Sequence, residues 1–340
     1  MASRGSASDL GGRVADRRGV AVVRVVALAG GVGGAKLAHG LQAVVGPDLT
    51  VVVNTGDDFD RHGLLVCADH DTVLYTLAGI ANREWGWGIA GETWNAADQM
   101  GQYGEETWFR LGDRDLATHV VRTARIRRGE RLTDVALHLQ RSLGVVARIL
   151  PMTDAEVRTH VRTDDGWLEF QEYFVHRHQE PVVHEVRFAR IEDARPSPEV
   201  DDAFDAADVI VVAPSNPIVS IGPILAVPGV RERIALARAR GVPVAAVSPI
   251  IVGHALKGPA DRMLTSLGHE SSALGVARLY RDLVDVYIYD ETDDPALATQ
   301  IEALGMRAVQ AATIMTDDAS RAALARTVLD AAVTGPAAVP

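Results

Sequence analysis

The stretch that most constrains the fold is residues 22–45, where an apolar run leads through a glycine-rich segment into helix-forming residues. Residues 22–29 are mostly β-branched, which predicts a buried strand. Helix-forming residues occupy 37–45. Strand, glycine loop and helix in this order present backbone N–H groups and a helix N-terminus to an anion. The glycines predicted to approach a phosphate are Gly30, Gly31, Gly33 and Gly34.

This loop matches neither of the two common phosphate-binding fingerprints. A P-loop requires Gly-Lys-Ser/Thr, whereas Lys36 is preceded by Ala35 and followed by Leu37. A dinucleotide fingerprint requires a third glycine at the position that Lys36 occupies. A phosphate loop of a less common kind is the favoured interpretation, and a tight turn without a ligand is the alternative.

Further apolar runs predict that the chain is α/β, with a Rossmann-like, mostly parallel, doubly wound sheet. Each of these runs is followed by a helix-like stretch; they lie at 50–53, 208–213, 243–247 and 284–288. From 148 to 190 the pattern alternates with period two, which favours a small antiparallel or mixed insertion, with 167–175 as one strand. We expect one domain over 22–334 with a helical and β insertion at about 80–200, a disordered extension at 1–21 and a tail at 335–340.

Composition excludes several classes of protein. The net charge of −11 argues against general nucleic-acid binding. No apolar run is long enough to span a membrane, and the N-terminal residues lack the apolar core of a secretory signal. The single cysteine, Cys67, rules out an internal disulfide framework and favours a cytoplasmic protein.

A group of acids follows the second predicted strand and suggests a magnesium site. The five aspartates that fall within 15 residues are Asp57, Asp58, Asp60, Asp69 and Asp71. Carboxylates beside a phosphate loop are the hard oxygen ligands that Mg²⁺ prefers. The alternative is a helix cap, for which Asp71 and Thr72 are candidates, together with solvated loop acids. Asn54 begins the same polar segment.

Polar and aromatic side chains elsewhere point to the same edge of the sheet. Ser215, Asn216 and Ser248 follow two later strands, where parallel sheets bind ligands. The only lysines in an arginine-rich chain are Lys36 and Lys257, each near a glycine. Tryptophans at 85, 87, 94 and 108 suit either a wall against a flat ring system or a small satellite core.

Taken in order, six motifs resemble the 2-phospho-L-lactate transferase family of coenzyme F-420 biosynthesis. They span most of residues 23–330 and are the segments 29–36, 54–58, 69–73, 111–115, 214–224 and 248–250. At 68–71 the family's usual Pro-Asp-Leu-Asp reads Ala-Asp-His-Asp, which retains both acids. Residues 62–64, 86–88 and 92–94 resemble actinobacterial members.

The resemblance implies a phosphotransferase for substituted phosphate groups. A phospho-acid linked to guanosine diphosphate would be transferred to the terminal hydroxyl of the deazaflavin Fo, with release of GMP and formation of F-420-0 or its dehydro form. The phospho-acid is 2-phospho-L-lactate in archaeal members and phosphoenolpyruvate in actinobacterial ones, and 3-phosphoglycerate is a further possibility. A homodimer is common in the family.

The resemblance also implies roles for individual residues. Asp57 and Asp69 would bind Mg²⁺, while Asp71 and Arg110 would contact Fo. One of these aspartates would serve as base to the Fo hydroxyl. The glycine loop, Lys36 and Asn54 would surround phosphate or guanosine, and the remaining donor contacts would come from Ser215, Asn216 and Ser248.

Two other functions remain as alternatives at this point. A nicotinamide-dependent oxidoreductase would share the fold, but the broken fingerprint and the pair of acids at 57–58 count against it. A non-catalytic nucleotide-binding protein would not need an aspartate cluster beside its phosphate loop.

Overall fold

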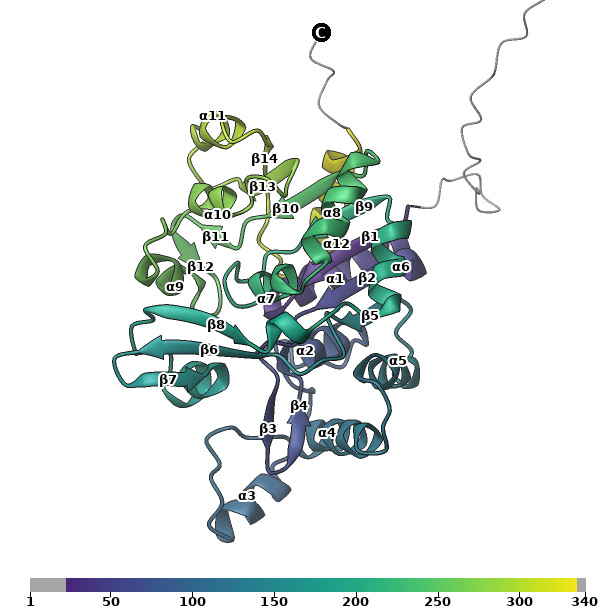
Figure 1. Ribbon diagram of the computed structural model, residues 1–340, viewed down its shortest axis with the longest axis vertical. Helices are drawn as coiled ribbons and strands as arrows, with labels where there is room; N and C mark the ends of the chain where they lie inside the picture. Colours follow the sequence, from purple (N-terminus) through teal and green to yellow (C-terminus); the bar gives the residue numbers. More distant parts are fainter. Residues whose placement is uncertain (1–22, 335–340) are drawn as a thin grey trace, which may run out of the picture.

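The computed structural model describes residues 23–334, so the predicted extension at 1–21 and tail at 335–340 lie outside the described residues. A parallel sheet of seven strands in the order β14-β13-β10-β9-β1-β2-β5 forms its centre (Figure 1). Its strands are β1 (Val25–Ala29), β2 (Leu49–Val53), β5 (Arg148–Pro151), β9 (Val209–Val212), β10 (Val244–Val247), β13 (Val286–Asp290) and β14 (Arg307–Ala311).

Helices cover both faces of this sheet, because alternate strand residues point to opposite faces. Val26 and Leu28 of β1 belong to one hydrophobic core, whereas Val25 and Ala27 belong to the other. The first core is covered by α6 (Pro198–Ala206), α7 (Ile221–Ala226), α8 (Val230–Ala239), α9 (Ala260–Ser266), α10 (Ala273–Leu279) and α11 (Leu297–Glu302). The second is covered by α1 (Gly31–Val45), α2 (Ala68–Leu77), α5 (Leu132–Ser142) and α12 (Asp318–Val333). The predicted doubly wound α/β fold is therefore confirmed.

Smaller elements project from the carboxyl edge of the sheet, at the lower part of Figure 1. A hairpin of β3 (Phe59–Arg61) and β4 (Leu64–Val66) lies beside α4 (Asp113–Ile126), with α3 (Asn95–Gln102) beyond it. A separate antiparallel sheet has the order β7-β6-β8. Its strands are β6 (Arg158–Thr163), β7 (Gly166–Glu169) and β8 (Glu185–Ala189), and a two-stranded ribbon is formed by β11 (Ile250–Ile251) and β12 (His254–Ala255). Three short helical turns complete the described chain: η1 (Gly46–Asp48), η2 (Glu172–His176) and η3 (Ile191–Asp193).

Three boundaries differ from the prediction. The stretch that starts at Arg148 opens with β5, which pairs in parallel with β2 in the main sheet and is not antiparallel. Residues 167–175 do not form one strand, because β7 ends at Glu169 and a π-helix occupies Glu172–His176. Helix α1 begins at Gly31, so the predicted glycine loop is its first turn. Among residues 23–334, no helix has the length and apolar character needed to cross a bilayer.

Candidate active site

The carboxyl ends of the central strands open into one cavity with a volume of about 1040 Å³. Strands β1, β2, β9 and β10 deliver polar or glycine residues to its wall: Gly30, Asp57, Ser215 and Ser248. The sheet order changes direction at β1, between β2 and β9, which is where open α/β sheets bind ligands.

The glycines at the start of α1 have two different tasks. A Cβ on Gly33 would lie 2.2 Å from the Pro214 carbonyl oxygen, and one on Gly34 would lie 2.5 Å from Ser215 Oγ. Gly31 has φ +60°, and its Cβ position is open apart from Asp69 at 3.8 Å. Gly30, Gly31 and Gly33 line the cavity, but Gly34 does not. Gly34 lets α1 pack against the segment after β9, and its contact with substrate stays a prediction.

Two carboxylates stand at the N-terminus of α1. Asp69 Oδ1 accepts a hydrogen bond from the Gly31 N–H (2.8 Å), and Oδ2 accepts one from Asn54 Nδ2 (2.9 Å). Asp57, at the end of the segment after β2, is buried, and its Oδ1 has no hydrogen-bond partner among the described residues. Both carboxylates line the cavity.

Asn54 lies behind this pair and not in the cavity wall. Its amide donates to Asp69 and to the Val219 carbonyl oxygen (3.1 Å), while its Oδ1 accepts from the Gly56 N–H (2.8 Å). All of these partners are protein groups, so Asn54 positions Asp69, and its contact with substrate stays a prediction.

The charges of this pair suit a divalent cation. Burial, and then the charge of Asp69, raises the pKa of Asp57 well above its usual range. Burial raises the pKa of Asp69 to about 6, although its hydrogen bonds from Asn54 and Gly31 act in the opposite direction. Two neighbouring carboxylates with raised pKa values and an unpartnered oxygen are what a bound Mg²⁺ would stabilise. The donor set thus fits the predicted ion.

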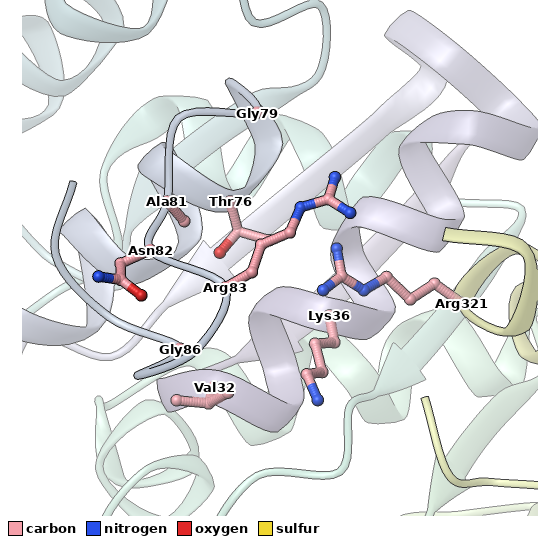
Figure 2. A pocket seen from close by; sticks show the side chains of 9 residues that line it. All are labelled: Val32, Lys36, Thr76, Gly79, Ala81, Asn82, Arg83, Gly86 and Arg321. Atoms are coloured by element: carbon pink, nitrogen blue, oxygen red, sulfur yellow. The ribbon is translucent and has the colours of Figure 1, made fainter. Parts of the chain in front are cut away.

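Lys36 lies between the main cavity and a much smaller one. Its Nζ donates to the Met315 carbonyl oxygen (2.9 Å), and burial followed by the charges of Arg321 and Lys257 lowers its pKa. Figure 2 shows Arg83 and Arg321 on the far side of the smaller cavity, with the Lys36 ammonium directed away from both. The two arginines share Asp318 (3.0 and 3.2 Å). Lys36 therefore directs its charge to the main cavity.

Three predicted donor contacts differ in what they can offer. Ser215 Oγ donates to the Gly30 carbonyl oxygen (2.7 Å) and accepts from the Gly30 N–H (3.1 Å). Ser248 Oγ is likewise bonded to the backbone of Ile250. Asn216 Oδ1 accepts from two backbone N–H groups, whereas its Nδ2 contacts only Met263 Sδ at 3.7 Å. All three line the cavity, and Asn216 has the most hydrogen-bonding capacity left for a ligand.

Another part of the cavity wall is aromatic. The tryptophans that line it are Trp85, Trp87, Trp94 and Trp108. Trp85 and Trp87 are 40% and 47% exposed, so they form a wall and not a satellite core. Arg110 lies over the ring of Trp94 at 4.7 Å. Lys257 donates to the Trp85 carbonyl oxygen (2.8 Å) and so holds this loop in place.

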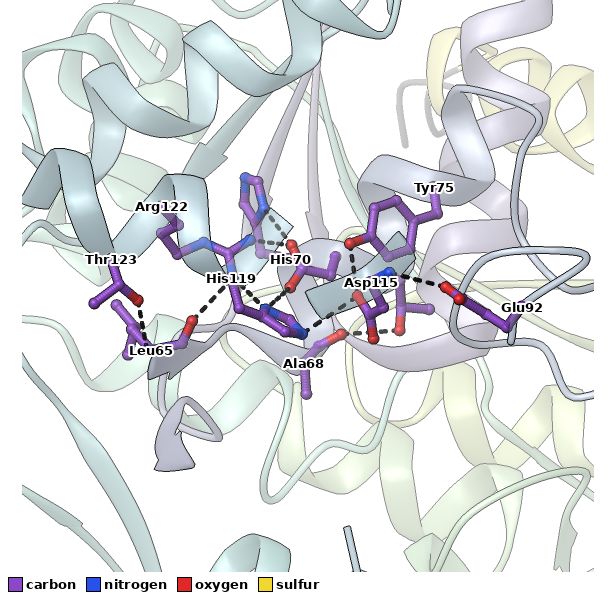
Figure 3. A network of polar contacts seen from close by, with 11 residues as sticks. Leu65, Ala68, His70, Tyr75, Glu92, Asp115, His119, Arg122 and Thr123 are labelled. Atoms are coloured by element: carbon purple, nitrogen blue, oxygen red, sulfur yellow. Dashed lines mark hydrogen bonds and ion pairs between the residues drawn. The ribbon is translucent and has the colours of Figure 1, made fainter. Parts of the chain in front are cut away.

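Asp71 has a different environment from Asp69. It is buried and forms an ion pair with Arg122, which is itself 1% exposed (Figure 3). It does not cap α2, which begins at Ala68. Asp71 still lines the cavity, together with three residues that the sequence analysis did not propose: Tyr75, Asp115 and His119. Asp115 and His119 are spaced i,i+4, so the sequence alone indicates that they share one face of a helix.

Comparison with known proteins supports the fold and identifies the family. A UPF0052 protein from Bacillus halodurans has a TM-score of 0.64 at 16% identity, covering 92% of this chain and all of that one. A phosphoenolpyruvate transferase from Kitasatospora aureofaciens is 46% identical, covering 90% of this chain and 97% of the relative. A 2-phospho-L-lactate transferase from Methanosarcina mazei is 39% identical, covering 90% and 100%.

The family model described as 2-phospho-L-lactate transferase CofD matches residues 25–333, nearly the whole described chain. The curated relatives above are transferases that align over nearly their full lengths. The chain therefore belongs to the 2-phospho-L-lactate transferase family and is a transferase enzyme.

Proposed function

We propose that the protein transfers a phospho-acid, phosphoenolpyruvyl or 2-phospho-L-lactyl, from a guanosine diphosphate-linked donor to the terminal hydroxyl of the deazaflavin Fo. The names of the relatives support the phospho-acid. The observation that carries the proposal is a single cavity lined both by the Asp57–Asp69 pair and by four tryptophans. The carboxylates suit a diphosphate and its metal, and the tryptophans suit a flat ring.

In the proposed reaction, the Fo hydroxyl oxygen attacks the phosphorus of the phospho-acid. A new P–O bond forms, the anhydride P–O bond breaks, and GMP leaves with its electron pair while the hydroxyl proton passes to a base. Mg²⁺ held by Asp57 and Asp69 would supply charge neutralisation for the diphosphate. The N-terminus of α1 and Lys36 would add positive charge on the same side.

The base is better sought at Asp57 or Asp69 than at Asp71. Burial alone would raise the pKa of Asp71, but the charge of Arg122 together with the neighbouring His70 and His119 outweighs burial and holds this pKa well below the usual range. A carboxylate of such low basicity is a poor proton acceptor. In this proposal Asp71 anchors the wall of the acceptor side, and Arg110 with Trp94 contacts the ring.

The test is an assay with purified protein, Fo, Mg²⁺ and each guanylylated phospho-acid, read by mass spectrometry. We expect an F-420-0-type product and GMP from at least one donor, and the productive donor identifies the phospho-acid. A protein that binds neither Fo nor any donor, and forms no product, would contradict the proposal.

A further inference from the structure

Helices α2 and α4 each contribute an i,i+4 pair to the cavity wall, and Figure 3 shows Tyr75 directed toward Asp115 with His119 beside it. Helix α2 contributes Asp71 and Tyr75, and α4 contributes Asp115 and His119. The ligand atoms of Asp71, Asp115 and His119 lie within 4.8 Å of one another. A metal at this point would compete with Arg122, whose guanidinium already occupies Asp71. The cluster therefore has to be understood through its hydrogen bonds.

Arg122 fixes the proton positions in this cluster. Its Nη1 lies 3.1 Å from His119 Nδ1, and because arginine can only donate, Nδ1 must accept. The proton of the neutral imidazole is then on Nε2, which is 3.3 Å from Asp115 Oδ1. Arg122 and Asp71 neutralise each other. The negative charge left in the network is on Asp115.

Asp115 is held on one side and open on the other. Its Oδ1 accepts a hydrogen bond from the Tyr75 hydroxyl (2.7 Å), and Tyr75 is 1% exposed. No described residue donates a hydrogen bond to Asp115 Oδ2, and the side chain lines the main cavity. A carboxylate can only accept hydrogen bonds, so Asp115 requires a donor from whatever occupies this part of the cavity.

The aromatic wall is fixed beside this carboxylate. Glu92 accepts hydrogen bonds from the backbone N–H groups of Arg114 (2.9 Å) and Asp115 (2.8 Å), so the loop that carries Trp94 caps α4. A Cβ on Gly112 would lie 2.2 Å from Glu92 Cδ, so glycine is needed for this contact. The free oxygen of Asp115 thus belongs to the same end of the cavity as the tryptophan wall.

We propose that Asp115 binds the acceptor molecule by accepting a hydrogen bond from a donor on the edge of its flat ring, either a hydroxyl or a ring N–H. Tyr75 and His119 are positioning residues that orient the carboxylate. This inference rests on the proposed function, because it takes the acceptor to be the deazaflavin. It makes Asp115 a determinant of acceptor affinity, distinct from the Asp57–Asp69 pair.

The test is equilibrium binding of Fo to the wild type and to Asp115→Asn, followed by Fo fluorescence. In the variant, Tyr75 still donates its hydrogen bond to the side-chain oxygen, so the NH₂ group faces the cavity and an acceptor is replaced by a donor. We expect Fo to bind about 10-fold to 100-fold more weakly, as for loss of a hydrogen bond to a charged group. The KM for Fo should rise in parallel, with kcat and the donor KM nearly unchanged.

Controls separate this role from a structural one. Asp134→Asn, in the exposed first turn of α5, should bind Fo like the wild type. A deazaflavin without the ring hydroxyl distinguishes the two donors: if the hydroxyl is the partner, Asp115→Asn no longer weakens its binding, and if the ring N–H is, the loss persists. Should Asp115→Asn not fold, Tyr75→Phe should still weaken Fo binding by a few-fold.

Equal Fo affinity of the wild type and a folded Asp115→Asn would overturn the inference and leave the proposed function intact. If Asp115→Asn does not fold, equal affinity of the wild type and Tyr75→Phe would overturn it. A wild type that does not bind Fo would overturn both.

Discussion

Asp69 and Asp71 stand two residues apart in the first turn of α2, and the protein treats them in opposite ways. Asp69 receives hydrogen bonds from two neutral donors and has Asp57 as a charged neighbour. Asp71 is paired with the buried guanidinium of Arg122. Burial raises the pKa of Asp69 to about 6, whereas Arg122 together with His70 and His119 outweighs burial and lowers the pKa of Asp71.

Helix geometry explains the difference. Two residues advance the side chain by about 200° around an α-helix, so the two carboxylates point in nearly opposite directions. Asp69 points to the start of α1, and Asp71 points to α4. Asp69, which has no cationic partner in the described part of the chain, is therefore suited to bind a ligand cation. Asp71, which is paired with Arg122, is suited to a structural role.

The largest effect on turnover is expected from removing a charge of the Asp57–Asp69 pair, which has no cationic partner among residues 23–334. We call it the uncompensated pair. Asp57→Asn and Asp69→Asn should each reduce turnover by about 1,000-fold or more, the loss of a few kcal/mol of transition-state stabilisation. The control is Asp60→Asn, since the Asp60 side chain is 69% exposed. Steady-state kinetics with the productive donor measures this, and near-normal turnover in both variants would remove the metal assignment.

A large effect on stability is expected when Asp71 loses its ion-pair partner Arg122. Arg122→Met should lower the free energy of unfolding by about 3–5 kcal/mol, because it leaves Asp71 buried without its cation. Arg128→Met, at a side chain that is 64% exposed, should change it by less than about 1 kcal/mol. Urea denaturation compares the two; equal stability would show that Asp71 does not need Arg122.

The uncompensated pair should instead be destabilising in the metal-free protein. Asp57→Asn should raise the free energy of unfolding at pH 8 by about 1–3 kcal/mol, because it removes a buried charge. Because the pKa of Asp69 is raised to about 6, the folded wild type holds a proton between about pH 6 and 4 that the unfolded chain has released, and the raised pKa of Asp57 acts in the same direction. The advantage of the variant should therefore shrink as pH falls through 6.

Thermal unfolding in EDTA at pH 8 and pH 5 measures this effect. A variant that is less stable than the wild type at pH 8, or an advantage that grows on acidification, would show that the Asp57–Asp69 charges are already compensated within the protein.

The smallest effect is expected at His70. His70 is 3% exposed, its ring nitrogens have no hydrogen-bond partner among residues 23–334, and Nδ1 lies 3.8 Å from Asp71. His70→Leu should leave turnover within about threefold and stability within about 1 kcal/mol. A large loss would mean that His70 shares the compensation of Asp71 with Arg122.

Much of the fold follows from local sequence, because β-branched runs bounded by glycine or polar residues mark the buried strands. The main sheet and the positions of Asp57 and Asp69 at its edge were predictable in this way. Strand β5 was harder, because Arg148–Pro151 is too short to reveal its parallel pairing. Likewise, the glycines of α1 resemble a loop until their contacts with Pro214 and Ser215 are known.

The partners of individual side chains could not be predicted, because they are distant in sequence. Arg122 lies 51 residues from Asp71. Asn54 resembles a ligand until its amide is seen on Asp69. The capping of α4 by Glu92 likewise depends on another loop.

The most direct test of the central claim is Mn²⁺ binding, followed by electron paramagnetic resonance of the wild type, Asp69→Asn and Asp60→Asn. Mn²⁺ takes the same hard oxygen ligands as Mg²⁺. The account predicts one Mn²⁺ per chain in the wild type and in Asp60→Asn, and a large loss of affinity in Asp69→Asn. Equal Mn²⁺ affinity in all three proteins would contradict the assignment of the Asp57–Asp69 pair as the metal site.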